Sequence, residues 1–499
     1  MDKTNESAVE SSASSAEVGN DKSKIRPVDT STAAKAVIWY TFGSILLKGI
    51  SFISTPIFTR LLTKEEYGAF SNITTFASLL TIFSTLELSA SMFRARTDFK
   101  DDMHRYMFSL MPFGNLITGA LYILVCIFMS DIERIFSIDS FYVHLIFVNL
   151  IVSPATTMIT TYLRYLYRYK LSTAISIGSA VLNVVVSLGF VLALENNLLG
   201  RTFGNYIVSI VIGLICYVYL FVKGRRVKAS YFTYAIQITF PLVFHLLSMY
   251  ILGQSDKLMI TSICGNEANA LYSLAYSCGI VLSFVWASLN SAFSPIIGDS
   301  LAAETPEYTR KMTFPYLAIY VVPTFLLMLL GPELVLIMGG ESYAEAVYVI
   351  PPVVAGSVIQ YTYTLYVNIE QYDKKTWRVA FGTTLAAATN IGLNAIFIPI
   401  YGYIAAAYTT LVCYLILFII HFTSVKLMKK THYYNTKAVF AIICLALIML
   451  ITSTVLYFVP VVRYIVSGLY MILVAFLLFK FKDKIISLLR PKKKSIKQD

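Results

Sequence analysis

Residues 437–459 read KAVFAIICLALIMLITSTVLYFV, and Lys437 is the single charged residue among them. A helix needs about 20 mainly apolar residues to cross the hydrocarbon core of a bilayer, and runs of this kind recur along the chain. Of the 499 residues, 57% are hydrophobic and 14% are charged, and the mean hydropathy is +0.69. A soluble chain carries about 25% charged residues. The composition therefore excludes a soluble enzyme and a disordered or fibrous chain, and it predicts an all-α polytopic membrane protein.

The two ends of the chain are polar. Residues 1–33 contain no aromatic residue and are too hydrophilic for a signal peptide, so residues 1–36 are predicted to form a disordered cytoplasmic tail. Residues 481–499 are predicted to form a basic cytoplasmic tail. The cysteines lie in apolar stretches without CxxC or CxxH spacing, so we interpret them as small buried hydrophobic residues rather than metal ligands or disulfides: Cys126, Cys216, Cys264, Cys278, Cys413 and Cys444.

Between the tails we predict fourteen transmembrane helices, arranged as two six-helix lobes and two C-terminal helices. The first lobe covers residues 37–222, the second covers residues 233–425, and the last two helices lie within residues 437–480. The predicted spans are 37–60, 67–93, 106–130, 141–163, 171–194, 203–222, 233–262, 269–297, 312–331, 346–369, 377–399, 403–425, 437–459 and 462–480.

The distribution of Lys and Arg orients these spans. The two tails and the loops on their side hold 33 of the bases, whereas the opposite loops hold 5. Because cytoplasmic loops are enriched in Lys and Arg, both termini are predicted to lie in the cytoplasm. The net charge of +12 therefore sits in short loops that face anionic lipid headgroups, and no folded module is large enough to bind nucleic acid.

Two pairs of similar segments predict that the lobes are repeats. EEYGAFS at residues 65–71 resembles EANALYS at residues 267–273, with an offset of 202. Spans 5 and 11 share one spacing of polar residues with an offset of 207, namely Ser176, Asn183 and Ser187 against Thr383, Asn390 and Asn394. A shift by six spans preserves chain direction, so the predicted pseudo-two-fold axis runs along the membrane normal.

Polar residues line one face of several spans, and in a membrane such faces turn toward the bundle interior. The faces are Thr41, Ser44, Lys48, Ser51, Thr55 and Thr59 in span 1; Ser172, Ser176, Ser179, Asn183 and Ser187 in span 5; His245, Ser248, Ser255 and Asp256 in span 7; and Gln360, Thr364, Asn368 and Gln371 in span 10. Each face either hydrogen-bonds a neighbouring helix or lines a wet cavity. Asn183, Asn390 and Gln360 are therefore candidate binding residues.

Lys48 lies near the middle of span 1, where a lysine costs about 3 kcal/mol unless it finds a carboxylate or water. Glu87 is the single acid inside span 2. A structural Lys48–Glu87 pair, a water-filled cavity in which Lys48 meets an anion, and a misplaced span edge all remain open. Glu87 and Asp256 are candidate ion-coupling residues, although Asp256 is also placed to neutralise the adjacent Lys257.

Further bases lie at the ends of the same helices. Arg60 ends span 1, Arg94 and Arg96 close span 2, and Lys257 in span 7 has a place similar to that of Arg60. These bases are either binding residues or interfacial anchors. The histidines are scattered, and the chain has no HExxH, GxSxG, P-loop or acidic metal cluster. The pattern indicates a transporter without catalysis, cofactor or ATPase of its own.

Several segments taken together resemble one family. They are KGISFISTPIFTRLLTKEEYGAFS from Lys48, ELSASMFRAR from Glu87, QSDKLMI from Gln254, SLNSAFSPIIG from Ser288 and TNIGLNAIFIPIYGYIAAAYTT from Thr389. In order and spacing, over about residues 36–480, the chain resembles the polysaccharide exporters of O-antigen and teichoic-acid type in the multidrug/oligosaccharidyl-lipid/polysaccharide flippase superfamily.

The resemblance implies a two-lobed bundle around a cavity that opens alternately to each side of the bacterial cytoplasmic membrane. It implies that undecaprenyl-pyrophosphate-linked oligosaccharide repeat units move from the inner to the outer leaflet for cell-surface polysaccharide biosynthesis. Membrane lipids, a polymerase and a co-polymerase are the implied partners. In such flippases a cationic cavity receives the pyrophosphate and sugars. Arg60 matches an arginine at the end of span 1 and Lys257 is its second-half counterpart, whereas Lys48 and Arg94 are assigned from position.

Two other functions remain open from the sequence. A cation-coupled multidrug or metabolite antiporter of the same fold needs a titratable acid facing its cavity and a more apolar pocket. The chain departs from that branch because it lacks an acidic cluster in the first half beyond Glu87. The other alternative is a non-transporting scaffold of a polysaccharide assembly complex.

Overall fold

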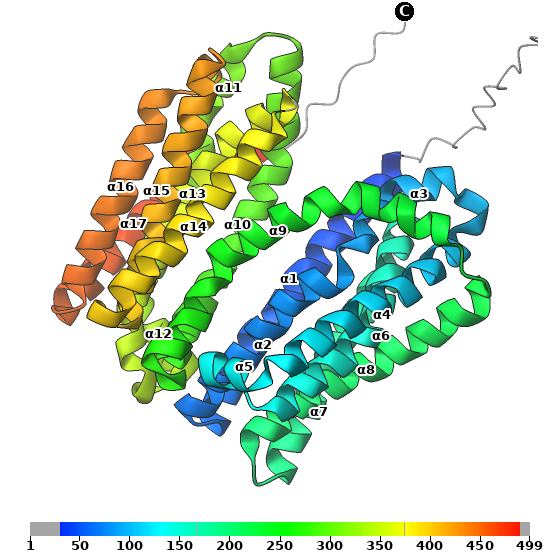
Figure 1. Cartoon of the computed structure of the whole chain (residues 1–499). Coiled ribbons are helices and arrows are strands. Elements are labelled where there is room, and N and C mark those ends of the chain that lie inside the picture. Colours follow the sequence, from blue (N-terminus) through cyan, green and yellow to red (C-terminus); the bar gives the residue numbers. More distant parts are fainter. Residues whose placement is uncertain (1–29, 167, 374, 490–499) are drawn as a thin grey trace, which may run out of the picture.

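The computed structural model describes residues 30–166, 168–373 and 375–489, and every regular element within these ranges is a helix (Figure 1). The predicted all-α class is confirmed. The predicted tails lie largely outside the described residues, but both terminal helices are longer than predicted. Helix α1 (Thr30–Leu61) begins inside the predicted N-terminal tail, and α17 (Pro460–Leu489) continues into the predicted C-terminal tail. Neither extension contains a Gly or Pro that would stop a helix.

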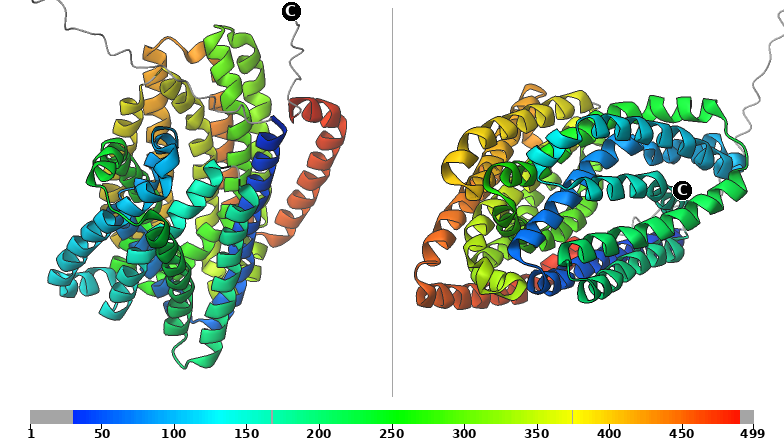
Figure 2. Two further views of the ribbon diagram at one scale, coloured as in Figure 1. Left: turned by 90° about the vertical axis from the view of Figure 1, so that its right-hand side faces the viewer. Right: turned by 60° about the horizontal axis from the view of Figure 1, so that its bottom comes forward.

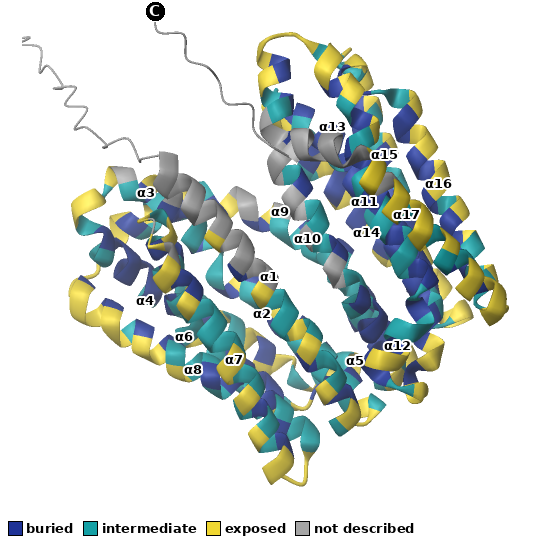
Figure 3. Cartoon of the chain, turned by 180° about the vertical axis from the view of Figure 1, so that it is seen from behind, coloured by how far each residue is buried: buried dark blue, intermediate teal, exposed yellow. Residues whose placement is uncertain are grey.

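Nine helical segments of the described ranges are long and apolar enough to cross a membrane, and they coincide with predicted spans 3–6 and 9–13. They are Lys100–Ile127, Ser140–Tyr165, Lys170–Ala193, Asn197–Gly224, Pro306–Leu329, Glu341–Tyr372, Thr376–Tyr401, Tyr403–Leu427 and Thr436–Leu456. The other predicted spans fall on α1, α2, α9, α10 and α17. The total of fourteen therefore stays a prediction. Many large apolar side chains are exposed on the outward sides of the helices, for example on α8 and α16 (Figure 3), where a bilayer would cover them.

The first half of the chain forms one helical bundle. Its helices are α1, α2 (Lys64–Thr85), α3 (Met92–Asp98), α4 (Met103–Ile127), α5 (Met129–Phe136), α6 (Ser140–Tyr165), α7 (Tyr169–Ala193) and α8 (Asn197–Gly224). Helix α8 packs along both α6 and α7, and α7 packs on α1. Small residues permit this close approach: a Cβ on Gly204 would lie 2.4 Å from the Cα of Ser187.

The second half is built around α13, which the helices around it cover. Its helices are α9 (Ala229–Cys264), α10 (Asn266–Ala302), α11 (Pro306–Leu329), α12 (Gly331–Gly339), α13 (Ile350–Tyr372), α14 (Thr376–Tyr401), α15 (Tyr403–Leu427), α16 (Thr436–Leu456) and α17. One continuous apolar cluster joins α10 to α16. Helix α9 spans both halves, because it contacts α2 and α4 as well as α14 (Figure 1).

The two halves touch at the end of the molecule that carries the α1–α2, α7–α8 and α9–α10 turns, here called the closed end. There α2 crosses α10, and the hydroxyls of Ser71 and Ser273 lie 2.7 Å apart. The amide of Asn269 donates to the carbonyl of Gly68 at 3.1 Å. A Cβ on Gly68 would lie 1.8 Å from the carbonyl oxygen of Asn266, so only glycine fits this crossing. The segments 65–71 and 267–273, which the sequence pairs as repeats, are therefore in direct contact.

Predicted span 2 is not one continuous helix. Helix α2 ends at Thr85, and Leu86 and Glu87 follow with φ of +44° and +50°. The prediction of a single helical span over 67–93 is therefore wrong. The sequence contains no glycine or proline at this point that would mark the break. The break is compensated locally, because the Glu87 N–H donates to the Thr85 hydroxyl. Beyond it, Leu88 and Met92 are buried in the core of the first half.

Helix α17 lies on the outside of the bundle (Figure 2). One end is fastened by Arg463, whose guanidinium donates to both carboxylate oxygens of Glu333 at 2.7 and 2.6 Å. The hydroxyl of Tyr464 donates to the same carboxylate at 2.8 Å. Burial alone raises the pKa of Glu333, but the hydrogen bonds from Arg463 and Tyr464 outweigh burial and hold that pKa below its usual range.

Candidate functional site

A cavity of about 400 Å³, here called the lysine cavity, lies between α1 and the second half. Its walls come from α1, α9, α10, α11, α13 and α15. The lining residues are Lys48, Gln254, Lys257, Tyr276, Ser277, Gly279, Leu282, Ser283, Trp286, Tyr320, Val353, Val354, Ser357, Gln360 and Tyr414. Three predicted binding residues that are far apart in the sequence, Lys48, Lys257 and Gln360, therefore line one space.

Lys48 reaches across the two halves. Its ammonium on α1 donates to the hydroxyl of Ser283 on α10 at 2.6 Å. Glu87 lines a different pocket, so the structure gives no support to a Lys48–Glu87 pair. Of the interpretations left open by the sequence, Lys48 on the wall of a cavity is the one that matches its position.

Aromatic side chains complete the lysine cavity on the second-half side. The ammonium of Lys257 lies 5.7 Å from the centre of the Tyr276 ring, a cation–π contact. The buried indole N–H of Trp286 has no hydrogen-bond partner among the described residues. The sequence analysis did not single out Tyr276 or Trp286, because tyrosines and tryptophans are common at membrane interfaces and carry no spacing signal.

The chemistry of these walls suits an anionic, hydroxyl-rich group. Ammonium groups bind phosphate oxygens through charge-assisted hydrogen bonds. The amides of Gln254 and Gln360 can donate to and accept from sugar hydroxyls. The flat face of an aromatic ring packs against the C–H face of a sugar, and the Trp286 N–H adds an unused donor.

Asp256 lies beside the cavity in a fully satisfied network. Its side chain is 1% exposed. One carboxylate oxygen accepts from the Asn394 amide at 2.7 Å, and the other accepts from the hydroxyls of Tyr272 at 2.5 Å and Thr410 at 2.7 Å. Asn390 joins this network through Thr410 at 3.0 Å. Asn390 is therefore placed next to Asp256, and it is not among the residues that line the lysine cavity.

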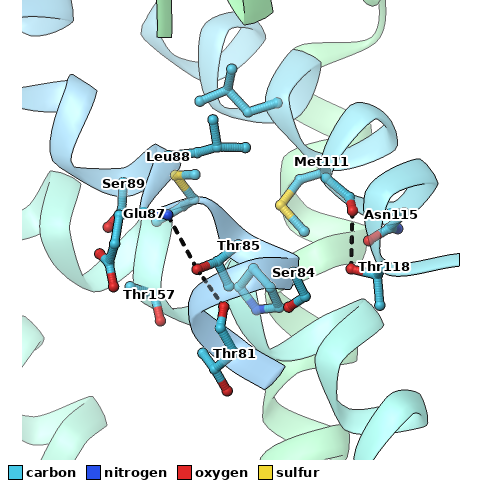
Figure 4. Close-up of a pocket in the computed structure, with 14 residues that line it drawn as sticks. Thr81, Ser84, Thr85, Glu87, Leu88, Ser89, Met111, Asn115, Thr118 and Thr157 are labelled. Carbon is cyan, nitrogen blue, oxygen red and sulfur yellow. Dashed lines mark hydrogen bonds between the residues drawn. The ribbon is translucent and has the colours of Figure 1, made fainter. Parts of the chain in front are cut away.

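Glu87 lines a separate pocket of about 160 Å³ inside the first half (Figure 4). The break after α2 places this half-buried residue at the pocket wall. Side chains from α2, from the short turn at Leu88–Ser91, from α4 and from α6 add oxygen atoms around it: Thr81, Ser84, Thr85, Ser89, Asn115, Thr118 and Thr157. A carboxylate surrounded by hydroxyl and amide oxygens can hold a proton or a small cation.

The remaining candidates lie elsewhere. Arg60 donates to the backbone carbonyls of Pro56 and Ile337 at the closed end. Arg94 is exposed and forms an ion pair with Asp98 at 3.4 Å. Asn183 donates to the backbone carbonyl of Asn205 at 3.1 Å and so fastens α7 to α8. The structure does not bring these three residues to the lysine cavity.

The sequence and the fold were compared with those of known proteins. The sequence profile described as polysaccharide biosynthesis protein matches residues 33–301. No curated protein matches the chain by sequence. The chain is similar in structure to the lipid II flippase MurJ in an inward closed conformation, with a TM-score of 0.63 and 17% identity over 90% of this chain and 100% of that chain. It is also similar to an inward-facing multidrug resistance MATE family transporter of the MOP superfamily, with a TM-score of 0.56 and 13% identity over 79% of this chain and 99% of that chain.

The family match covers more than half of the chain, and the structural matches extend the likeness to the second half. The resemblance seen in the sequence is thereby confirmed. The chain belongs to the polysaccharide biosynthesis protein family and has the fold of the MOP superfamily of membrane transporters.

Proposed function

We propose that this protein is a flippase that moves undecaprenyl-pyrophosphate-linked oligosaccharide repeat units from the inner to the outer leaflet of a bacterial cytoplasmic membrane. The observation that carries the proposal is the lysine cavity, in which Lys48 of the first half and Lys257 of the second half share one space with amides and aromatic rings. The lysines would hold the pyrophosphate, and Gln254, Gln360 and Trp286 would contact the sugars. The lipid tail stays in the bilayer.

Such a cavity lowers the barrier that the headgroup otherwise faces. A diphosphate and several sugars lose their hydration in about 30 Å of hydrocarbon, and polar side chains replace the lost water. The distribution of Lys and Arg predicts that the closed end faces the outside and that both termini lie in the cytoplasm. The structure then corresponds to a state sealed toward the outside, and transport requires separation of α2 from α10.

Two carboxylates are proposed to couple transport to an ion. Asp256 precedes Lys257 in α9, so a change of charge at Asp256 is felt in the lysine cavity. Glu87 would load its ion inside the first half, at the break after α2.

On the outer side of the membrane, a polysaccharide polymerase and co-polymerase would take the translocated unit.

Flipping of a fluorescent undecaprenyl-pyrophosphate oligosaccharide in proteoliposomes tests the proposal. Lys48→Ala and Lys257→Ala are expected to reduce the flipping rate at least tenfold, because one charge-assisted phosphate contact contributes about 1.5–3 kcal/mol. Lys437→Ala removes an exposed lysine that does not line the cavity and serves as the matched control. Wild-type flipping by both cavity variants, or unchanged surface polysaccharide in a deletion strain that carries Lys48→Ala, would overturn the proposal.

A cation-coupled antiporter of small molecules is the second candidate, and the Glu87 pocket favours it. That function needs a titratable acid beside a pocket with apolar walls, and Leu88, Leu110 and Met111 line the pocket next to Glu87. The two functions differ in what Glu87→Gln affects. An antiporter would lose drug efflux in this variant, whereas a flippase would show no drug efflux in the wild type and Glu87→Gln would alter only the coupling of flipping to the ion.

A further inference from the structure

Two ionisable side chains meet in the centre of the second half, away from the lysine cavity and the Asp256 network. The Nδ1 of His421 on α15 lies 2.6 Å from the Oε2 of Glu370 on α13, and both side chains are 0% exposed. This contact could not be predicted from the sequence, because the residues are 51 positions apart and neither belongs to a motif.

Each member of this pair keeps an unused polar atom. The Oε1 of Glu370 and the Nε2 of His421 are buried, and neither has a hydrogen-bond partner among the described residues. Buried polar atoms are nearly always hydrogen-bonded, so two orphaned atoms in one pair are unusual. A purely structural pair of this depth would be expected to use both.

The imidazole is packed against side chains of α13 and the backbone of α14. The ring of Tyr363 stacks on His421 with centres 5.5 Å apart. On the other helix in contact, α14, the residue beside the imidazole is Gly382, where even an added Cβ would stay 3.5 Å from Nε2. The same Cβ would lie 3.4 Å from Cε1 of the imidazole, so Gly382 brings the backbone of α14 close to the ring.

Charged and titratable neighbours are already engaged elsewhere. Arg378 on α14 donates to Ser424 on α15 at 3.2 Å, and Lys430 after α15 pairs with Asp373 after α13 at 2.6 Å. The titratable groups that face the pair from the helices packed around it are Tyr363, Tyr366, Asp373, Arg378, Tyr414, Lys430 and Tyr434. Lys430 is neutralised by Asp373, whereas Arg378 keeps its positive charge because a serine hydroxyl does not neutralise a guanidinium.

We propose that Glu370 and His421 form a proton-binding site that gains and loses one proton during the working cycle. With neutral imidazole and ionised carboxyl the pair carries one negative charge, and with one added proton it is neutral. A buried net charge is costly, whereas a neutral hydrogen-bonded pair is tolerated. The packed second half therefore holds the proton, and loosening of α13 from α15 releases it.

The position of the pair gives the proton an exit. Glu370 is two residues from the end of α13 and His421 is six residues from the end of α15, which is about 3 Å and 9 Å along a helix axis. Both ends lie on the side predicted to be cytoplasmic. The site therefore exchanges protons with that side when the Asp373–Lys430 contact opens. Packing of α13 against α15 strengthens proton binding by a certain free energy. By reciprocity, proton binding stabilises the packed form by the same free energy.

Titration of the purified full-length protein tests the site without any transported substrate. Proton uptake is measured between about pH 5 and 8, the range in which imidazole titrates, for wild type, Glu370→Gln, His421→Asn and the double variant. Glu370→Gln keeps an acceptor for the imidazole N–H and so is the conservative variant. Asp131→Asn removes an exposed carboxylate on α5 in the first half, which takes no part in the proposed site, and is the matched control.

The wild type and Asp131→Asn are expected to take up about one proton per chain more than the double variant. Equal uptake by all folded variants would show that the pair does not titrate, and loss of folding in every variant of the pair would show a structural role; either result overturns the proposal. The link of this proton to flipping rests on the proposed function. If proteoliposomes show proton uptake but no flipping, the proton site stands and the transport assignment fails.

Discussion

At the scale of single residues, Asp256 shows how a charge is accommodated in the interior of this protein. Donors from three helices converge on its carboxylate. In Asp256→Asn the new amide N–H group would face the donors from Tyr272 and Thr410. We expect a loss of about 1–3 kcal/mol of stability, because buried donors are left without acceptors.

Thermal unfolding in detergent checks this expectation. Asp131→Asn is the matched control, because Asp131 forms an exposed ion pair with Arg134, and such pairs contribute little. The melting temperature should fall clearly for Asp256→Asn and stay near that of the wild type for Asp131→Asn. Equal melting temperatures would mean that the network around Asp256 is not what holds α9 to α14 and α15.

The cavity residues that carry a charge inside an apolar span could be predicted from the sequence. Most of the uncharged residues of the cavity could not. Lys48 and Lys257 stand out because a charge in an apolar span is costly. The partner of Lys48 could not be foreseen, since Ser283 lies 235 positions away and is an ordinary serine. The contact between Glu370 and His421 could not be predicted for the same reason. Neither residue belongs to a motif, and only the fold brings their side chains together.

At the scale of helices, the contact between α2 and α10 is the feature that movement must break. Ser71 and Ser273 lie with their hydroxyls 2.7 Å apart. In a background in which the exposed Cys126, Cys264 and Cys444 are replaced by serine, Ser71→Cys with Ser273→Cys should form a disulfide under mild oxidation. We expect the oxidised protein to stop transport and to recover after reduction, because the halves can no longer separate.

Gel mobility after cleavage between the halves measures the disulfide, and flipping in proteoliposomes measures transport. Ser78→Cys with Ser273→Cys is the control, since Ser78 is exposed two turns further along α2. If the oxidised variant with Ser71→Cys and Ser273→Cys transported at the full rate, the claim that the closed end must open during transport would be wrong.

The attachment of α17 should depend on pH through Glu333. The pKa of this carboxyl is lowered in the folded protein, so its contacts stabilise the protein above the unfolded pKa of about 4.3, and this contribution disappears as the pH falls through the lower folded value. Glu333→Gln should melt earlier than the wild type at neutral pH, and the difference should vanish in acid. Glu341→Gln, at an exposed acid in the following turn, should show no such difference at any pH.

Helix boundaries were predictable where the sequence carries a stop signal. The predicted edges of spans 141–163 and 171–194 fall within two residues of α6 and α7, whereas α8 begins six residues before the predicted start at 203. The break after α2 could not be predicted, because Leu86 and Glu87 adopt positive φ without being glycine. Packing of Leu88 and Met92 into the core determines that conformation, and packing is not visible in a local pattern.

At the scale of the whole molecule, the orientation in the membrane remains to be measured. Reporter fusions after Asn196, Glu267 and Gly402 are expected to report the outside, because these turns lie on the side with few bases. Fusions after Lys100, Arg226 and Lys430 should report the cytoplasm. A consistent reversal in either set would overturn the fourteen-span arrangement.

The crossing at the closed end also bears on how such a chain arose. On the predicted repeat, Gly68 corresponds to Ala270 and Ser71 to Ser273, and both pairs of equivalent positions lie against each other. Equivalent positions touch only where the symmetry axis passes, as in the isologous contact of a homodimer. A half-length ancestor would thus have met its own copy through this patch, and one mutation would have altered both sides at once. Fusion of two such genes would have removed that restriction, so that one side could keep glycine for close approach while the other gained the asparagine that bonds to it.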